Sequence, residues 1–255
     1  MSRVDGILFD IDGVLTRDGH ALPGAVKTVA ALRERSFPFR LVTNTTRKSR
    51  RDVARSLAGA GLAVEAPEIM TPVLAARRLL EERNWNGHYL VDPRAVVDLP
   101  PEAATEPDAV LVGDLGDDFT VERLNVAFRY LKQGAALIAL QKNRYWLTGG
   151  LPTLDAGPFV AALEFAGEIE AEVLGKPNAA FFRAAEQELF GGGGGRVALI
   201  GDRWETDVEG ARAAGFEGIL VKTGMYEPGD ERRGSPDAIL ESVGELLPWI
   251  DSPRL

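Results

Sequence analysis

The alternation of short apolar segments with helical segments constrains the fold of this 255-residue chain more than any other feature. Residues 4–10, VDGILFD, read as a buried strand that ends in an acid. A helix is expected from Pro23 to about Arg35, followed by a strand over 39–43 and a helix over 50–60. Strands that alternate with helices in this way predict an α/β fold with a parallel sheet.

The same alternation continues through the rest of the chain and predicts two α/β units. The middle segment is expected to hold strands at 88–92, 109–112 and 136–140 and helices at 73–83, 121–132 and 158–165. The last third is expected to hold strands at 171–174, 196–200 and 218–221, helices at 178–189 and 206–214, and a last helix from about Pro236. We therefore predict one domain from residues 1–70 and 173–255, interrupted by an inserted domain at 71–172.

Composition and charge exclude several classes of protein. The absence of cysteine removes disulfides, thiolate metal sites and a cysteine nucleophile. A formal net charge of −9 argues against nucleic acid as a partner, and two histidines argue against a histidine-rich zinc site. No apolar run is long enough to predict a membrane span, and the amino terminus lacks the pattern of a signal peptide, so we expect a cytoplasmic location.

Two acids follow the first predicted strand. Asp10 and Asp12 precede Gly13, which favours a sharp turn at the carboxyl end of the strand, where parallel sheets bind ligands. One carboxylate could attack phosphorus, and the other could protonate the leaving oxygen and then deprotonate water. An ordinary turn with two solvated acids is the alternative, and it would be preferred if this pair stood alone.

Two further segments carry groups suited to phosphate. Thr43 and Asn44 end the second predicted strand, where a hydroxyl and backbone amides suit a phosphoryl oxygen, although both residue types also occur in ordinary turns. Lys176 precedes a helix that Asn178 is expected to cap. A lysine at this point can neutralise a phosphate and a nucleophilic carboxylate, although a surface lysine is the simpler interpretation when it is considered alone.

A fourth segment adds acids that could bind a metal. The apolar strand at 196–200 runs into Asp202, and Asp207 follows five residues later. Mg²⁺ prefers an octahedral site with few carboxylates and several waters. The carboxylates of Asp10 and Asp202 and the backbone carbonyl of Asp12 would supply three oxygens. Asp207 would hold a coordinated water or orient Lys176, and it would also compensate charge at the start of a helix.

In their order and strand-end positions, these four segments resemble the four motifs of the haloacid dehalogenase superfamily. The segments are Asp10-Ile11-Asp12-Gly13, Thr43-Asn44, Gly175-Lys176-Pro177 and Gly201-Asp202 with Asp207. The resemblance covers the whole chain. Because the second unit lies between Thr43 and Lys176, the chain looks like subfamily IIA, which carries a C2a-type cap. The resemblance implies a Rossmann-like core with an inserted α/β cap domain.

The resemblance also implies an activity, namely a Mg²⁺-dependent phosphatase of small phosphorylated compounds that forms an aspartyl-phosphate on Asp10. It implies catalytic roles for Asp10, Asp12 and Lys176, with Ile11 and the second motif also binding substrate. Superfamily members that remove halide usually lack the second acid, so Asp12 favours phosphoryl chemistry. Two alternatives remain: transfer of phosphoryl to an acceptor other than water, and phosphate binding without catalysis. Arg203 and Trp204 depart from the small polar or acidic residues of many relatives.

Substrate choice is expected to depend on the predicted cap. The candidate residues at its rim are Asp92, Arg94, Lys142, Arg144 and Tyr145. Hinges are expected near 68–72 and 170–174, and the family resemblance leaves a homodimer through the cap edge as one option for assembly. A basic stretch could guide anions, although a solvated helix face is the simpler interpretation; its residues are Arg47, Lys48, Arg50, Arg51 and Arg55.

Overall fold

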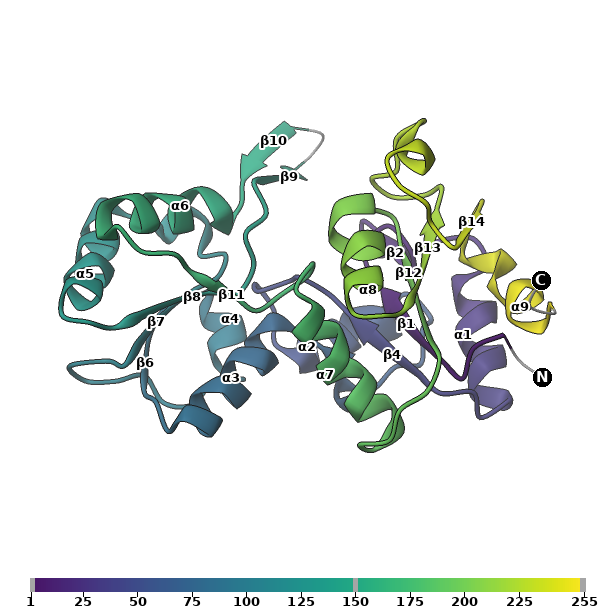
Figure 1. The fold of residues 1–255 in the computed structure, drawn as a ribbon, viewed down its shortest axis with the longest axis horizontal. Helices are drawn as coiled ribbons and strands as arrows, with labels where there is room; N and C mark the ends of the chain where they lie inside the picture. Colours follow the sequence, from purple (N-terminus) through teal and green to yellow (C-terminus); the bar gives the residue numbers. More distant parts are fainter. Residues whose placement is uncertain (1–2, 149–150, 253–255) are drawn as a thin grey trace. The chain divides into compact units, whose positions relative to one another are not determined.

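The computed structural model of this protein describes residues 3–148 and 151–252. Its internal contacts divide these residues into two compact units (Figure 1). The first unit comprises the described residues through Thr43, then Arg51–Met70, and the described residues from Lys176 onward. The second comprises Asn44–Arg50 and Thr71–Gly175. No helix in the described part of the chain is both long and apolar enough to cross a lipid bilayer.

The first unit is built on a six-stranded sheet in which every neighbouring pair is parallel. In spatial order the strands are β14 (Ala238–Leu240), β13 (Glu217–Val221), β12 (Val197–Gly201), β1 (Gly6–Asp10), β4 (Phe39–Val42) and β5 (Ile69–Met70). Strands β1 and β12 are buried along their whole length. This is expected for parallel strands covered by helices on both faces.

Helices cover both faces of this sheet (Figure 1). Helices α1 (Ala25–Glu34), α2 (Arg50–Gly59) and α9 (Leu246–Asp251) share a core with inward side chains of β1 and β4 such as Phe9 and Leu41. Helices α7 (Ala179–Phe190) and α8 (Glu209–Ala213) lie on the other side, and α7 contacts β1 and β4. The expected cap of α7 is confirmed, because the Asn178 side chain accepts a hydrogen bond from the backbone of Ala180.

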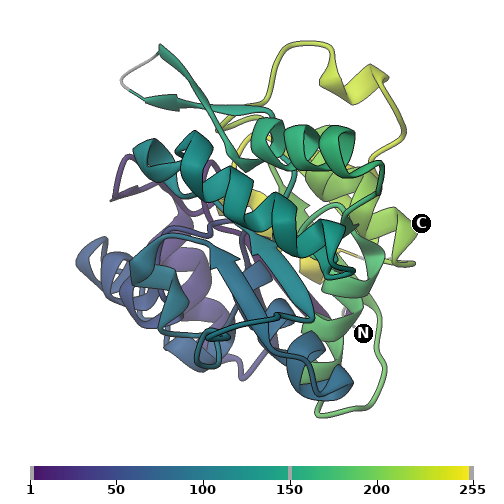
Figure 2. The ribbon, with the colours of Figure 1, turned by 90° about the vertical axis from the view of Figure 1, so that its left-hand side faces the viewer.

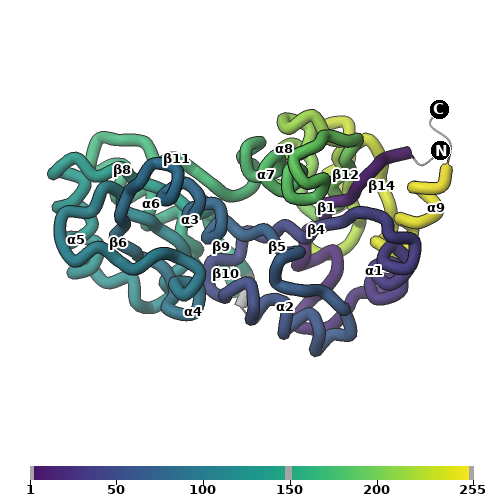
Figure 3. The backbone as a smooth tube through the Cα atoms, turned by 90° about the horizontal axis from the view of Figure 1, so that it is seen from below, coloured from purple at the N-terminus to yellow at the C-terminus, as the bar shows by residue number. Residues whose placement is uncertain are grey.

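Several short elements complete the first unit. They are the hairpin β2 (Thr16–Arg17) and β3 (His20–Ala21), the 3₁₀ helices η1 (Ala66–Glu68), η4 (Asp230–Arg232) and η5 (Val243–Glu245), and a π-helix, η3 (Trp204–Val208). Figure 3 shows the backbone path from β1, in purple, to α9, in yellow. Near the two ends of the described chain, the backbone N–H of Arg3 donates a hydrogen bond of 3.1 Å to the carbonyl oxygen of Ile250.

The second unit has its own four-stranded parallel sheet. The strands, in spatial order, are β11 (Glu172–Val173), β8 (Ala136–Ala139), β7 (Ala109–Val112) and β6 (Gly87–Leu90). One face packs against α3 (Pro72–Arg83) and α4 (Pro93–Val96), and the other against α5 (Val121–Lys132) and α6 (Ala156–Gly167), which run side by side in Figure 2. The unit also contains η2 (Gly116–Asp118) and the antiparallel pair β9 (Tyr145–Thr148) and β10 (Leu151–Leu154).

The α/β fold class is confirmed, with a Rossmann-like parallel sheet and a second α/β unit. The last helix was expected from about Pro236, and that expectation is wrong. Strand β14 occupies this region, paired in parallel with β13, and α9 begins only at Leu246. The start of the strand is fixed by Asp237, whose carboxylate accepts a bond of 2.8 Å from Gly218 N. The pair β9–β10 was not expected, and a π-helix replaces the expected start of the helix at 206–214.

Candidate active site

The candidate site lies at the carboxyl edge of the first unit's sheet. Asp10 ends β1, which lies between β12 and β4, and Asp202 and Thr43 directly follow those two neighbours. After β1 the chain continues to β4 on one side of it, and the later strand β12 pairs with β1 on the other side. The strand order therefore reverses at β1, and α/β sheets bind ligands at such a point. The parallel topology therefore gathers residues that are far apart in the sequence.

Lys176 connects two of the acids. Its Nζ donates hydrogen bonds to Oδ1 of Asp10 at 2.6 Å and to Oδ1 of Asp207 at 2.7 Å. The loop before α7 supplies Lys176, and the π-helix η3 supplies Asp207, whose other oxygen accepts a bond from Arg203 N at 3.2 Å. A side chain on Gly201 would place its Cβ 2.1 Å from the Cβ of Asp207, so only glycine fits beneath this acid.

Three carboxylates form a compact buried cluster. Asp10, Asp202 and Asp207 are 7%, 2% and 1% exposed, and each offers an oxygen within 4.8 Å of the others. Burial raises the pKa of Asp10 well above its ordinary value, and the charges of Asp207 and Asp202 add to the effect while Lys176 opposes it. Burial, followed by the charge of Asp207, raises the pKa of Asp202 to about 6.

The charge of this cluster fits a divalent cation. Burial alone would lower the pKa of Lys176, but Asp10 and Asp207 together raise it above its ordinary value, so the amine carries a positive charge. Three carboxylates and one ammonium leave two negative charges in excess when all are ionised. Excess buried charge is costly unless it is compensated, and an all-oxygen set of carboxylates is the kind of site that Mg²⁺ prefers.

Asp12 has a different environment from Asp10, because it is exposed and lies in a tight turn. Gly13 N donates to Thr16 O at 2.7 Å, and Leu15 N donates to Ile11 O at 2.9 Å. Gly13 has φ +89°, a backbone conformation that side chains other than glycine rarely adopt. The turn therefore separates the two acids of the first motif into one buried and one exposed carboxyl.

The remaining expected site residues fall in both units. Ile11 and Thr43 are buried in the first unit, and Thr43 N donates to Met70 O at 3.2 Å. Asn44 is the first residue of the second unit, where a Cβ on Gly175 would lie 2.6 Å from its side-chain oxygen.

The expected rim residues all belong to the second unit. Asp92 caps α4 and accepts hydrogen bonds from the backbone and the side chain of Arg94. The side-chain hydrogen bond is the main reason that the pKa of Asp92 is lowered. Lys142 pairs with Glu164 at 2.7 Å, Arg144 is exposed, and Tyr145 is 48% exposed at the start of β9. These residues follow β6 and β8, at the carboxyl edge of the second sheet.

Sequence reasoning missed two features, one in each unit. Arg47 does not lie on a solvated helix face: it precedes α2, and its guanidinium lies 3.8 Å from Asp92, 3.6 Å from Asp114 and 5.5 Å from the ring of Trp146. In the first unit, the backbone N–H of Met225 donates to Oδ2 of Asp202 at 2.6 Å. No side-chain pattern marks a backbone donor, so only the folded structure could find it.

Comparison with known proteins identifies the class. The profile described as "Haloacid dehalogenase-like hydrolase" matches residues 7–94, and a second haloacid dehalogenase-type profile matches residues 173–246. The two matched ranges contain both acids of the first motif, Lys176, Asp202 and Asp207.

Curated relatives and solved structures agree with this class. The chain is 39% identical over 234 residues to haloacid dehalogenase-like hydrolase domain-containing protein 2 of Rattus norvegicus, covering 92% of this chain and 90% of the relative. It is 36% identical over 264 residues to phospholysine phosphohistidine inorganic pyrophosphate phosphatase of the same species, covering 98% and 97%. A crystal structure of 4-nitrophenylphosphatase from Thermotoga maritima matches with a TM-score of 0.87 at 27% identity, covering 97% and 98%.

The chain belongs to the haloacid dehalogenase-like hydrolases, and within them to subfamily IIA. It is similar over nearly its whole length to the two curated relatives just described, and it is an enzyme of the phosphatase type.

Proposed function

We propose that this chain is a Mg²⁺-dependent phosphatase that hydrolyses small phosphorylated compounds through an aspartyl-phosphate on Asp10. The observation that carries the proposal is the buried cluster in which Lys176 bridges Asp10 and Asp207 beside Asp202. A surface turn with solvated acids would show neither this burial nor this lysine. The cluster offers a nucleophile, a fixed positive charge and oxygen ligands in one place.

In the first half of the proposed reaction, a carboxylate oxygen of Asp10 attacks phosphorus. The bond between phosphorus and the leaving oxygen breaks, and Asp12 gives its proton to that oxygen. Lys176 offsets the negative charge on the phosphoryl oxygens, and the Thr43 hydroxyl with the backbone amides near Ile11 and Asn44 binds the same oxygens.

In the second half, water attacks phosphorus and gives a proton to Asp12. The bond between phosphorus and Asp10 breaks, which releases phosphate and restores both carboxyl groups to their starting states. The exposed position of Asp12 suits this role, because an acid that serves a leaving group and then a water must be reachable by both.

Mg²⁺ would be held by the carboxylates of Asp10 and Asp202 and by the backbone carbonyl of Asp12. When bound, it supplies charge stabilisation of the phosphoryl oxygens. Asp207 accepts a hydrogen bond from Lys176 and thereby orients the ammonium toward Asp10. The residues present therefore fit the ion in both charge and donor type.

We further propose that the second unit, with residues 71–172 as its main segment, is a C2a-type cap that selects the substrate. The chain passes from one unit to the other directly after Thr43 and directly before Lys176. Two of the proposed phosphate-binding residues thus border on segments of the cap, so movement of the cap would be transmitted to them along the backbone.

Turnover of 4-nitrophenyl phosphate tests the proposal. We expect activity with Mg²⁺, loss of activity after exhaustive chelation, recovery when Mg²⁺ returns, and inhibition by high Ca²⁺, whose looser coordination disturbs in-line geometry. Full activity after chelation would refute the metal assignment. Phosphoryl transfer to an added alcohol in preference to water would favour a phosphotransferase, and phosphate binding without turnover would favour a binding protein.

The physiological substrate requires a panel. The names of the relatives define its first members, which are 4-nitrophenyl phosphate, phospholysine, phosphohistidine and inorganic pyrophosphate. A panel of phosphomonoesters beside these compounds, compared by kcat/KM, would distinguish a preference for P–O bonds from one for P–N bonds.

A further inference from the structure

The loop between β13 and β14 returns to the acid cluster of the first unit. Within it, the backbone N–H of Met225 donates to Oδ2 of Asp202 at 2.6 Å, and this carboxylate is almost fully buried. The bond comes from a residue 23 positions away. It fixes one oxygen of Asp202, and the other oxygen, Oδ1, can then be presented to a cation.

Gly13 and Gly224 lie beside Oδ2 of Asp202, the oxygen that accepts the hydrogen bond from Met225. A Cβ on Gly224 would lie 1.9 Å from Asp202 Oδ2, and a Cβ on Gly13 would lie 2.1 Å from the same atom. Both glycines have positive φ, at +63° and +89°. The backbone of both glycines therefore approaches the carboxylate closely, and a side chain at either position would displace it.

Further bonds hold this arrangement together. The Thr223 hydroxyl donates to Gly13 O at 2.5 Å, and Arg17 donates to Gly224 O at 2.5 Å. The turn at 223–225 is thus tied to the turn that follows the first motif. Asp202 lies where the two turns meet.

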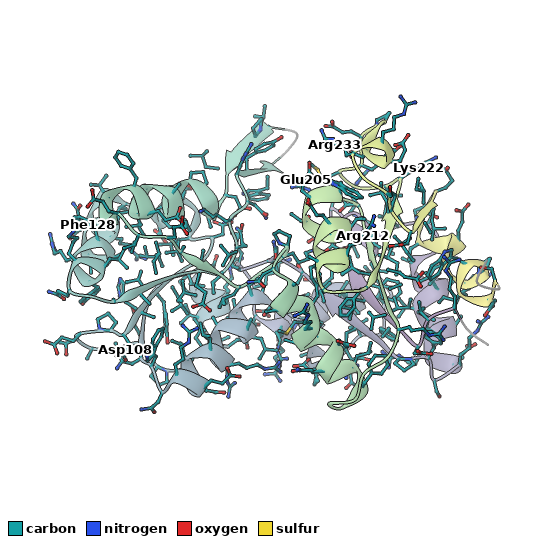
Figure 4. The ribbon with its side chains drawn as sticks, in the orientation of Figure 1. Asp108, Phe128, Glu205, Arg212, Lys222 and Arg233 are labelled. Atoms are coloured by element: carbon teal, nitrogen blue, oxygen red, sulfur yellow. The ribbon has the colours of Figure 1, made fainter. Side chains whose placement is uncertain are left out.

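The far end of the same loop is fastened to the residues that follow Asp202. A Cβ on Gly234 would lie 1.8 Å from the ring of Trp204, so the indole occupies the space beside this glycine. Glu205 pairs with Arg233 at 2.6 Å, and the two side chains lie beside each other in Figure 4. Arg212 of α8 donates to Ser235 O. Trp204 and Glu205 therefore anchor the loop.

We infer that the turn Gly224–Met225, anchored through Trp204, is a positioning element that sets the orientation of the Asp202 carboxylate for the metal ion. The inference rests on the proposed function, because it takes Asp202 as a ligand of Mg²⁺. Mg²⁺ demands near-ideal octahedral geometry, and groups that orient a ligand typically change metal affinity by about 10- to 100-fold when they are lost. Gly224 and Met225 act through Asp202 and need no contact with substrate.

The test is calorimetric titration of Mg²⁺ into wild type and Gly224→Ala. Gly191→Ala is a matched control, because Gly191 has φ +61° and no atom within 4 Å of a Cβ, so it reproduces the backbone strain without the contact. We expect Gly224→Ala to weaken Mg²⁺ binding by about 10- to 100-fold, Gly191→Ala to leave it unchanged, and saturating Mg²⁺ to restore much of the kcat of Gly224→Ala.

A second variant keeps the inference testable if Gly224→Ala does not fold. Trp204→Leu removes the anchor without touching Asp202, and we expect a smaller loss of Mg²⁺ affinity at unchanged KM. Wild-type affinity in folded Gly224→Ala, or in folded Trp204→Leu when Gly224→Ala is unfolded, would overturn the inference. Absence of Mg²⁺ binding by the wild type would overturn the proposed metal site itself, which separates the two failures.

Discussion

The ammonium nitrogen of Lys176 lies 2.6 Å from Oδ1 of Asp10, although the two residues are 166 positions apart in the sequence. Both side chains are almost completely buried, and Asp207 is the second partner of the lysine. Removing one member of a buried charge cluster leaves the others uncompensated, which is far more costly than losing a pair at the surface. This relationship gives the first prediction.

Lys176→Met should lower the free energy of unfolding by roughly 3–5 kcal/mol in metal-free protein, because two buried carboxylates lose their partner. Mg²⁺ should recover part of the loss, because it adds positive charge to the same cluster. Chemical denaturation with and without Mg²⁺ measures both effects. Lys142→Met, which removes a half-exposed pair with Glu164, should change stability by only about 0–1 kcal/mol. Equal losses in the two variants would contradict the buried charge argument.

The two acids of the first motif should respond differently to the same substitution. Asp10→Asn should abolish turnover, because the nucleophile is gone. Asp12→Asn should keep phosphate binding and lose about 10²–10⁴-fold in rate, because only proton transfer is impaired. Steady-state kinetics, with trapping of the acyl phosphate by hydroxylamine, distinguishes the two. Substantial activity in Asp10→Asn beside an inactive Asp12→Asn would reverse the assigned roles.

The raised pKa of Asp202 predicts how pH and Mg²⁺ act together. Burial moves this pKa from 3.8 to about 6. Between these two pH values, the metal-free folded protein holds a proton on Asp202 that the unfolded chain has already released. The stability that this proton contributes is fully present below the unfolded pKa of 3.8, and it is lost as the pH rises through the folded pKa of about 6. Mg²⁺ binds the deprotonated form, so its stabilisation should grow over the same pH range.

Melting temperatures with and without Mg²⁺ test this linkage. The increase caused by Mg²⁺ should be larger at about pH 7.5 than at about pH 5. Asp202→Asn should show little increase at either pH. A pH-independent increase in wild type would mean that the ion binds elsewhere.

Substitutions in the second unit should change substrate ranking and leave the chemistry intact. Arg144→Ala and Tyr145→Ala, just before and at the start of β9, change exposed side chains and should alter relative kcat/KM across the phosphoester panel, because the second unit is proposed to select the substrate. Mg²⁺ dependence and trapping of Asp10 by a phosphate-mimicking fluoride complex should not change. Arg129→Ala, exposed on α5, is the control in the same unit. Unchanged ranking in Arg144→Ala and Tyr145→Ala, together with altered ranking in core variants beside Thr43, would assign specificity to the core.

Much of the fold could be predicted because the relevant signals are local. The apolar runs of β1 and β12 identified buried strands, and a capping residue, Asn178, identified the start of α7. The alternation of these elements required a parallel sheet, and a parallel sheet brings its carboxyl ends to one edge. The proximity of Asp10 to Asp202 followed from that topology, and no knowledge of side-chain packing was needed.

Other features could not be predicted, because they depend on partners distant in sequence. The apolar run at 238–240 became a strand because β13 offered it an edge, where local pattern favoured a helix. Arg47 looked like a surface charge until the fold placed it between Asp92 and Asp114.

The sequence by itself determined the α/β class, the order of the motifs and the acids at the sheet edge, because each depends on residue type and short-range periodicity. Only the tertiary structure decided how those acids are held. It buried Asp10 and left Asp12 exposed, and it placed Asp207 against Lys176. It also brought the backbone of Met225 to Asp202. Hydrogen-bond geometry and burial arise from packing between distant segments, such as those of Asp10 and Lys176, which are 166 residues apart, and no local pattern encodes such packing.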